Sequence, residues 1–133
     1  RAGITISGHG RTVVAVSVQE PVLFLIDTTG ERVGEAVPLK DVAKPAQIAR
    51  YAPDWSLLAV TSLNSDTVSL ISPSFRAQTA VKVGSQPMDM AFRGDELFVA
   101  CQGDGSVHVV DIPARRVKHS FAAGTGCESL GFF

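Results

Sequence analysis

The chain has 133 residues, of which 45% are hydrophobic and 19% charged, and its formal net charge is −1. This composition is sufficient for one domain with a core and is unlike that of a disordered chain. A nearly neutral chain lacks the concentrated positive field that nucleic acids and anionic membranes attract, so neither is expected as a partner. The longest near-apolar stretch, Val22–Ile26, is far shorter than the roughly 18 residues needed to span a bilayer.

The N-terminal part of the chain predicts four short strands. Each strand is rich in Val, Ile, Thr, Leu or Phe, and turn-forming residues separate one strand from the next. Ser7–Gly10, for example, supplies the turn after the first strand. The predicted strands are Ile4–Ile6, Val13–Ser17, Val22–Asp27 and a more weakly patterned Arg32–Leu39.

The same succession of strands and turns then recurs twice, from Pro45 to Gly84 and from Pro87 to Gly124. The second copy predicts strands at Gln47–Tyr51, Leu57–Thr61, Thr67–Ile71 and Thr79–Val83. The third copy predicts strands at Asp89–Phe92, Glu96–Cys101, Ser106–Asp111 and Val117–Phe121. No stretch shows sustained helical periodicity, so the whole chain is expected to be all-β.

A repeat of about forty residues with four short strands is typical of a β-propeller blade. We therefore predict three four-stranded blades, at approximately residues 3–44, 45–86 and 87–127. Residues 128–133 repeat the start of the third copy and predict the first strand of a fourth blade. Because propellers close with about 4–8 blades, we expect a partial propeller. The chain would be a piece of a longer protein, or its ring would be completed by a second chain.

The repeats resemble the YVTN-type repeats of bacterial β-propellers. The matching segments are LLAVTSLNSDTVSLIS (Leu57–Ser72), LFVACQGDGSVHVVD (Leu97–Asp111) and the connector VGSQPMDMAF (Val83–Phe92). Ser62 and Gln102 stand where that repeat usually has Asn. The resemblance implies a superfamily that includes lactonase-type enzymes and the haem-carrying propellers of nitrite reductases. WD-repeat proteins are a weaker match, because the Trp-Asp ending is absent from this chain.

Polar residues gather on one predicted loop face of the propeller. This face is formed by the turns between second and third strands and by the passages from blade to blade. The candidate ligand-binding residues there are Gln47, Asn64, Asp66, Asp89, Gln102, Asp104 and Glu128. Asn64, Asp66 and Asp104 have an alternative role as turn formers. Asp89 and Glu128 flank an inner strand, where a carboxylate needs water, a partner or a metal.

The histidines and cysteines offer weaker hypotheses. His9 lies in a turn on the opposite face, and His108 and His119 lie in predicted strands, so we interpret all three as surface or half-buried side chains. Cys101 and Cys127 could approach each other and form a disulfide; packing as unpaired, small apolar groups is the alternative. Two cysteines do not make a metal cage, and no metalloprotease, nucleophile-elbow or phosphate-loop motif is present.

The sequence favours a non-catalytic binding or scaffold propeller whose polar loop face recognises a protein or a small-molecule ligand. One alternative is a lactonase-type hydrolase with Asp89 or Glu128 among its carboxylates, in which Ca²⁺ would be the cofactor. Another is a redox propeller that carries haem or a quinone, with His108 or His119 as a weak ligand candidate. No cofactor is expected for the binding propeller. The resemblance favours a periplasmic or extracellular location, and a cytoplasmic one stays open.

Overall fold

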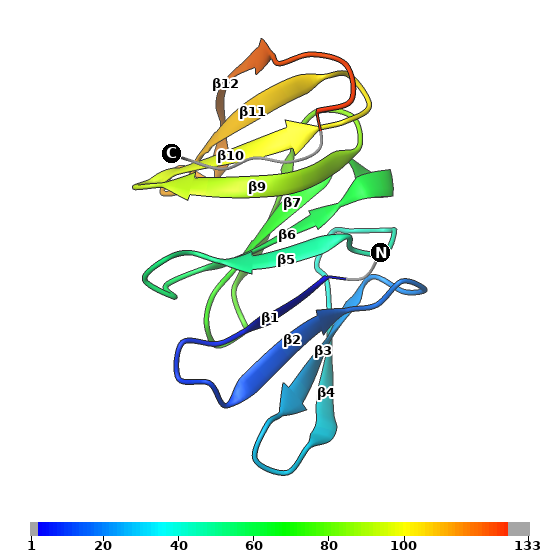
Figure 1. Cartoon of the computed structure of the whole chain (residues 1–133), viewed down its shortest axis with the longest axis vertical. Coiled ribbons are helices and arrows are strands. Elements are labelled where there is room, and N and C mark those ends of the chain that lie inside the picture. Colours follow the sequence, from blue (N-terminus) through cyan, green and yellow to red (C-terminus); the bar gives the residue numbers. More distant parts are fainter. Residues whose placement is uncertain (1–2, 128–133) are drawn as a thin grey trace.

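The computed structural model describes residues 3–127, which fold into three antiparallel sheets of four strands each (Figure 1). Sheet 1 contains β1 (Ile4–Ile6), β2 (Thr12–Val16), β3 (Val22–Asp27) and β4 (Arg32–Pro38). Sheet 2 contains β5 (Ile48–Tyr51), β6 (Leu58–Ser62), β7 (Thr67–Ile71) and β8 (Gln78–Lys82). Sheet 3 contains β9 (Pro87–Arg93), β10 (Glu96–Cys101), β11 (Ser106–Asp111) and β12 (Arg116–Ala122).

Each sheet is a meander in which every strand pairs with the next one along the chain. The three sheets are stacked along the long axis of the molecule, from β1–β4 through β5–β8 to β9–β12 (Figure 1). The first strands of successive sheets contact one another, β1 with β5 and β5 with β9. These are the inner strands of three propeller blades, and β4, β8 and β12 are the outer ones. The all-β partial propeller predicted from the sequence is thereby confirmed.

The strand positions agree with the sequence prediction to within one or two residues at each end. The spacing of β-branched residues and turn formers was sufficient to place them. A single 3-10 turn, η1 (Leu63–Ser65), joins β6 to β7 and is the only helical segment among residues 3–127. Within those residues, no helix has the length and apolar character needed to cross a membrane. The predicted strand at 128–133 lies outside the described residues.

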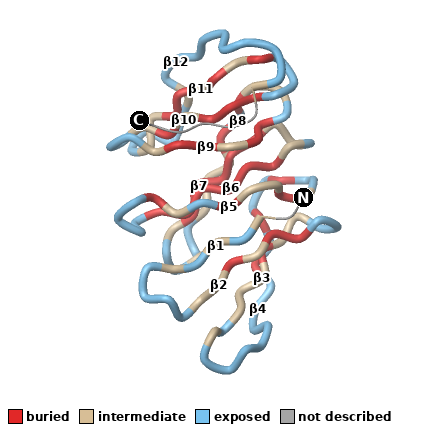
Figure 2. Tube along the Cα trace, in the orientation of Figure 1, coloured by how far each residue is buried: buried red, intermediate tan, exposed pale blue. Residues whose placement is uncertain are grey.

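Two apolar interfaces hold the sheets together, and we call them the first and second seams. The first seam, between sheets 1 and 2, is filled by residues such as Val14, Leu23 and Leu58. The second seam, between sheets 2 and 3, is filled by residues such as Leu70 and Leu97. Figure 2 shows buried positions along the central strands and exposed positions at the turns. Each fully buried Leu or Val stabilises the fold by roughly 1.5–3 kcal/mol through burial of its apolar surface.

β6 is central to both seams, because all five of its residues are buried. Successive side chains of a strand point to opposite faces. Leu58 and Val60 therefore belong to the first seam, and Ala59 belongs to the second. Thr61 lies on the same face as Ala59, and its hydroxyl donates a hydrogen bond to the Met88 carbonyl of β9 at 2.8 Å. This hydrogen bond thus links sheet 2 to sheet 3 across the second seam.

The face of sheet 1 that points away from sheet 2 is apolar but exposed. Ile4 and Ile6 of β1 are 67% and 48% exposed, and Val33 of β4 is 61% exposed. Their cross-strand partners on this face are also apolar, since Ile4 pairs with Ala15 and Val33 with Ile26. The equivalent face of sheet 2 is covered by sheet 1. The exposed face therefore resembles one of the two apolar faces that meet in a seam.

Candidate functional site

The predicted loop face lies along one side of the molecule, the right-hand side in Figure 1. The connections β2–β3, β6–β7 and β10–β11 lie there, together with the linkers from one sheet to the next. Of the sequence candidates, Asn64 and Gln102 are exposed on the β6–β7 and β10–β11 loops. Gln47 is half-buried just before β5, and its backbone N–H donates to the Thr61 carbonyl at 2.7 Å.

Asp66 and Asp104 are brought to the same linker, the segment between β8 and β9. Asp66, from the β6–β7 loop, accepts a hydrogen bond from the Gln86 backbone N–H at 3.0 Å. Asp104, from the β10–β11 loop, accepts one from the Ser85 backbone N–H at 3.2 Å. Two blades therefore hold one linker by a carboxylate each. Both hydrogen bonds join the carboxylate to a segment distant in the sequence and are not bonds within its own turn.

The linker is held by backbone hydrogen bonds as well. Gly103 N–H donates to the Ser85 carbonyl and Gln102 N–H to the Gln86 carbonyl, both at 2.9 Å. Val83 N–H donates to the Asp66 carbonyl at 2.9 Å. Because so many of its polar backbone groups are paired within the protein, this part of the loop face is preorganised.

Asp104 also accepts a hydrogen bond from the Ser106 hydroxyl at 2.6 Å. That bond, followed by those from backbone N–H groups, holds the pKa of the Asp104 carboxyl below its usual range. Asp104 is therefore an ionised acceptor at neutral pH and is poorly suited to donate a proton. Such a carboxylate orders its neighbours and contributes negative charge to the face.

Cys101, Ser106 and His108 form a polar cluster beneath the linker, on the side of sheet 3 that faces sheet 2. His108 Nδ1 lies 3.2 Å from the Ser106 hydroxyl and 3.7 Å from the Cys101 thiol. Gly84 covers the cluster so closely that an added Cβ would lie 2.7 Å from His108 Cε1. Burial raises the pKa of the Cys101 thiol to about 11, so the thiol is not a ready nucleophile.

The structure does not contain the disulfide that the sequence allowed. Cys101 and Cys127 are both free thiols. Cys101 is buried, with its sulfur directed to the Val99 carbonyl and to His108, and it behaves as the small packed group that we gave as the alternative. The hydrogen bonds to Asp66 and Asp104 hold a different passage, the linker between β8 and β9.

Asp89 lies within β9, on the inner side of the blades, and is not clustered with the loop carboxylates. It forms an ion pair with Arg50 of β5, with 2.7 Å between Arg50 Nη2 and Asp89 Oδ1. Glu128 lies outside the described residues. Within residues 3–127, no group of three or more His, Cys, Asp and Glu side chains is arranged to hold a metal ion. His119 is exposed and stacks on Phe121 with 6.4 Å between ring centroids.

A hollow of about 350 Å³ adjoins the Asp104 loop on this face. Its lining comes from the β10–β11 loop and from the segment after β12, and includes Gln102, Asp104 and Thr125. This hollow offers space for a ligand group on the loop face. Gln102 and Asp104 were identified from the sequence, whereas Thr125, in the passage that follows β12, was not.

The sequence reasoning missed a second region, at the opposite end of the blades. Two hollows occur there, each at the end of one seam. The larger, about 400 Å³, is at the first seam and is lined by Ser7, Gly8, His9, Thr12, Tyr51, Asp54, Trp55, Pro73 and Phe75. The signal available in the sequence was the unusual presence of Trp55 and Phe75 in turns.

Comparison with known proteins supports the fold. No family model matches the sequence, and no match was found among curated proteins. Among solved structures, hydrazine synthase of Kuenenia stuttgartiensis superposes with a TM-score of 0.81 at 23% identity, covering 93% of this chain and 36% of that one. The Cps50 (Swd1) β-propeller domain of Myceliophteria thermophila superposes with a TM-score of 0.69 at 16% identity, covering 94% and 42%. The chain thus spans about two fifths or less of these structures, which show its fold alone.

Proposed function

We propose that the chain is a non-catalytic binding or scaffold segment of a β-propeller, whose polar loop face recognises a protein or small-molecule ligand. The observation that carries this proposal is the double anchoring of one linker by Asp66 and Asp104. Carboxylates used in this way build a fixed surface, because each one is already occupied by backbone N–H groups.

The groups that remain outward on this surface suit recognition. Asn64 and Gln102 are exposed, and an amide side chain both donates and accepts hydrogen bonds. Gln102 also lines the hollow of about 350 Å³ beside the Asp104 loop. A preorganised face with exposed amides binds its ligand without first ordering its own loops, which reduces the entropic cost of binding.

The same contacts weigh against the hydrolase alternative. A calcium-assisted lactonase needs several oxygen ligands directed at one ion. Asp89 is instead paired with Arg50, and Asp104 accepts from Ser85 and Ser106. A ligand can bind to the loop face while Asp89 and Asp104 keep these partners.

We further propose that the exposed apolar face of sheet 1 is covered in the working protein by another propeller blade, from the same protein or from a second chain. Ile4, Ile6 and Val33 support this, since their side chains repeat the apolar character of the two seams. The YVTN-like segments Leu57–Ser72 and Leu97–Asp111 support a bacterial propeller in the periplasm or outside the cell.

The proposal can be tested on an array of peptides and glycans probed with fluorescently labelled protein. Wild type is compared with the loop-face variant Asn64→Ala/Gln102→Ala and with Arg76→Ala, an exposed residue at the opposite end. We expect array positions that bind wild type and Arg76→Ala but lose most of their signal with the loop-face variant. Equal binding by all three proteins would contradict a role for the loop face. Ca²⁺-dependent opening of simple lactones by wild type would contradict the non-catalytic assignment.

A further inference from the structure

The hollow at the end of the first seam is built from three turns of two blades. The β1–β2 turn supplies Ser7, Gly8 and His9, the β5–β6 turn supplies Asp54 and Trp55, and the β7–β8 turn supplies Pro73 and Phe75. Tyr51, at the end of β5, completes the aromatic part of the lining. These turns lie together on the left-hand side of Figure 1, at the end opposite the loop face. The volume of the hollow, about 400 Å³, is within the range of small-molecule sites.

The aromatic side chains form a corner. The rings of Tyr51 and Trp55 are 6.4 Å apart between centroids and lie at 81° to each other, so they act as two nearly perpendicular walls. Phe75 contributes a third aromatic ring to the same hollow. Trp55 is nevertheless 40% exposed, which leaves indole surface accessible from solvent. Tyr51 and Phe75 also pack against the apolar core of the first seam, which fixes their positions in the lining.

Trp55 and Phe75 occupy backbone conformations that bulky residues seldom adopt. Their φ angles are 61° and 65°, in the left-handed region. In the β5–β6 turn, Trp55 N–H donates a hydrogen bond to the Ala52 carbonyl at 2.9 Å. In the equivalent β1–β2 turn of sheet 1, Gly10 N–H donates to the Ser7 carbonyl, also at 2.9 Å. Gly10 has a φ of 73°. A tryptophan thus stands where the neighbouring blade has a glycine, in spite of the conformational cost.

The indole is held in place by the facing blade. A Cβ added to Gly8 would lie 2.1 Å from Trp55 Cδ1, so the indole lies directly over this glycine of the β1–β2 turn. Any other residue at position 8 would displace it. The wall of the hollow is therefore fixed by a contact between sheets 1 and 2.

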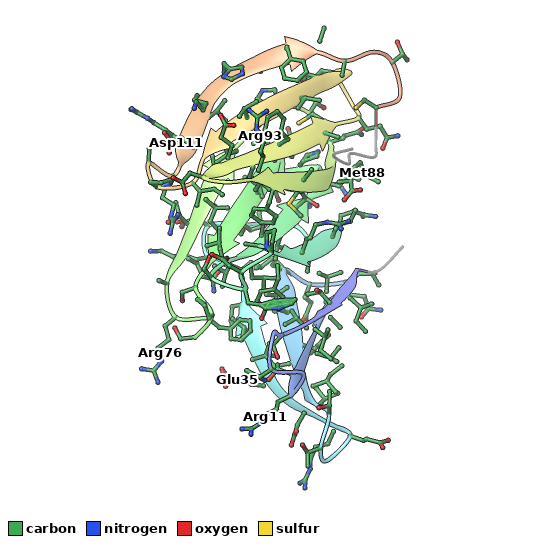
Figure 3. The ribbon with its side chains drawn as sticks, turned by 60° about the vertical axis from the view of Figure 1, so that its left-hand side comes forward. Arg11, Glu35, Arg76, Met88, Arg93 and Asp111 are labelled. Carbon is green, nitrogen blue, oxygen red and sulfur yellow. The ribbon has the colours of Figure 1, made fainter. Side chains whose placement is uncertain are left out.

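The hollow carries one negative charge. Asp54 Oδ1 accepts hydrogen bonds from the Ser56 hydroxyl at 2.6 Å and from the Ser56 backbone N–H at 3.1 Å. These bonds lower the pKa of the Asp54 carboxyl, and the carboxylate still has lone pairs for a ligand. His9 Nδ1 accepts a hydrogen bond from the Arg11 backbone N–H at 3.0 Å and lies 3.2 Å from the Ser7 hydroxyl. Arg11 and Arg76 project outward from the flanking turns (Figure 3).

From this geometry we infer that the hollow binds an organic ammonium group, a quaternary or alkylated amine, with Asp54 as counter-charge and Tyr51, Trp55 and Phe75 as its walls. An aromatic face attracts a cation by about 0.5–2 kcal/mol, and a nearby carboxylate adds to the attraction. The site is separate from the loop face and does not depend on the function proposed for that face.

The hollow at the end of the second seam provides an internal comparison. It has about 270 Å³ and contains the carboxylates Asp54 and Asp95, but its lining includes no aromatic ring among the described residues. The remaining lining residues are Ala52, Pro53, Ser56, Leu57, Gly94 and Ile112. Negative charge is thus common to the two hollows, and the aromatic corner is particular to the first.

The test is a titration with choline and with its neutral carbon isostere, 3,3-dimethylbutan-1-ol. Trp55 is the one tryptophan in the chain, so its fluorescence reports the site directly. We expect saturable quenching by choline, with a dissociation constant near 1 mM, and at least tenfold weaker binding of the neutral alcohol. Equal binding of the two would overturn the inference, as would saturable binding of glucose alone or no saturable signal up to about 10 mM choline.

Variants distinguish a specific loss of choline binding at this hollow from a general change in the fold. Asp54→Asn retains the acceptor for Ser56 and removes the charge, so choline affinity should fall by about five- to tenfold, measured by calorimetry. Phe75→Leu should weaken choline binding and leave the dimethylbutanol affinity nearly unchanged. The matched control Asp95→Asn removes the carboxylate that lines the second hollow and not the first, and should not alter choline binding. Loss of choline binding in Asp95→Asn, or full binding by Asp54→Asn, would contradict the assignment.

Discussion

The two seams between the sheets are built on one plan and differ at their polar positions. In sheet 3, Cys101, Ser106 and His108 face the second seam and contact one another, and Asp104 joins them through Ser106. The strand registers, Ser62 with Thr67 and Cys101 with Ser106, identify Ser62, Thr67 and Ser69 as the equivalent residues of sheet 2. Those three face the first seam, and their hydroxyls are buried without a hydrogen-bond partner.

This difference shows which positions of a blade are alike in the two seams and which are not. The apolar positions are retained in both seams because they supply the packing energy. The polar positions at the ends of the second and third strands differ between sheets 2 and 3. Linked groups beneath a tight linker characterise the second seam, and an aromatic hollow characterises the first. The polar groups and the turns therefore differ between the two seams, whereas both seams share an apolar frame.

The largest expected effect concerns the apolar packing that the two seams share. Leu58 in the first seam and Leu97 in the second occupy equivalent positions, and both are fully buried. Leu58→Ala and Leu97→Ala should each lower the free energy of unfolding by about 2–5 kcal/mol, because each leaves a cavity. Urea denaturation measures both. A loss below 1 kcal/mol in only one of them would break the equivalence of the seams.

A smaller effect is expected where the linker covers the second seam. Gly84→Ala would bring a Cβ within 2.7–2.9 Å of His108, Asp104 and Ser106, and it should destabilise the chain by roughly 1–3 kcal/mol. Gly34→Ala is the control, since its nearest neighbour would be the Leu25 carbonyl at an ordinary 3.6 Å. Thermal unfolding compares the two variants, and equal melting temperatures would show that the linker is not tightly seated.

The unpartnered hydroxyls of the first seam predict a change of opposite sign. Thr67→Val replaces a buried hydroxyl that has no partner by a methyl group of similar size, and should stabilise the protein by about 1 kcal/mol. Ser106→Ala, at the equivalent position of sheet 3, removes a donor to Asp104 and should destabilise by about 1 kcal/mol. Chemical denaturation of both variants decides the matter. A loss of stability in Thr67→Val would show that its hydroxyl is bonded after all.

The smallest effect concerns thiol reactivity at the polar end of the second seam. Cys101 is buried with its pKa raised to about 11, whereas Cys127 is partly exposed. Near pH 8 a maleimide reagent should label Cys127 in the folded protein and both thiols only in denaturant. Mass spectrometry counts the labels. Rapid labelling of Cys101 in the folded state would mean that the linker opens readily.

The strands could be predicted from the sequence because alternating β-branched residues and turn formers are local signals. The candidate site could be predicted only in outline. Asp66 and Asp104 were located on the correct face, but their hydrogen bonds to one linker depend on how two blades meet, which sequence spacing does not encode. The aromatic hollow was missed for the same reason. Gly8, Trp55 and Phe75 come from three turns that only the stacking of sheets 1 and 2 brings together.

The most direct test of this contrast between the seams is a nitrogen–proton correlation spectrum of the labelled chain during addition of choline. We predict shifts confined to residues 7–12, 51–56 and 74–76, which surround the hollow of the first seam. The amides of Gly94, Asp95 and Ile112, at the second hollow, should not move beyond the small changes expected from added salt. Shifts of equal size at both hollows, or shifts at the loop face alone, would contradict the assignment of the ammonium site to the aromatic corner.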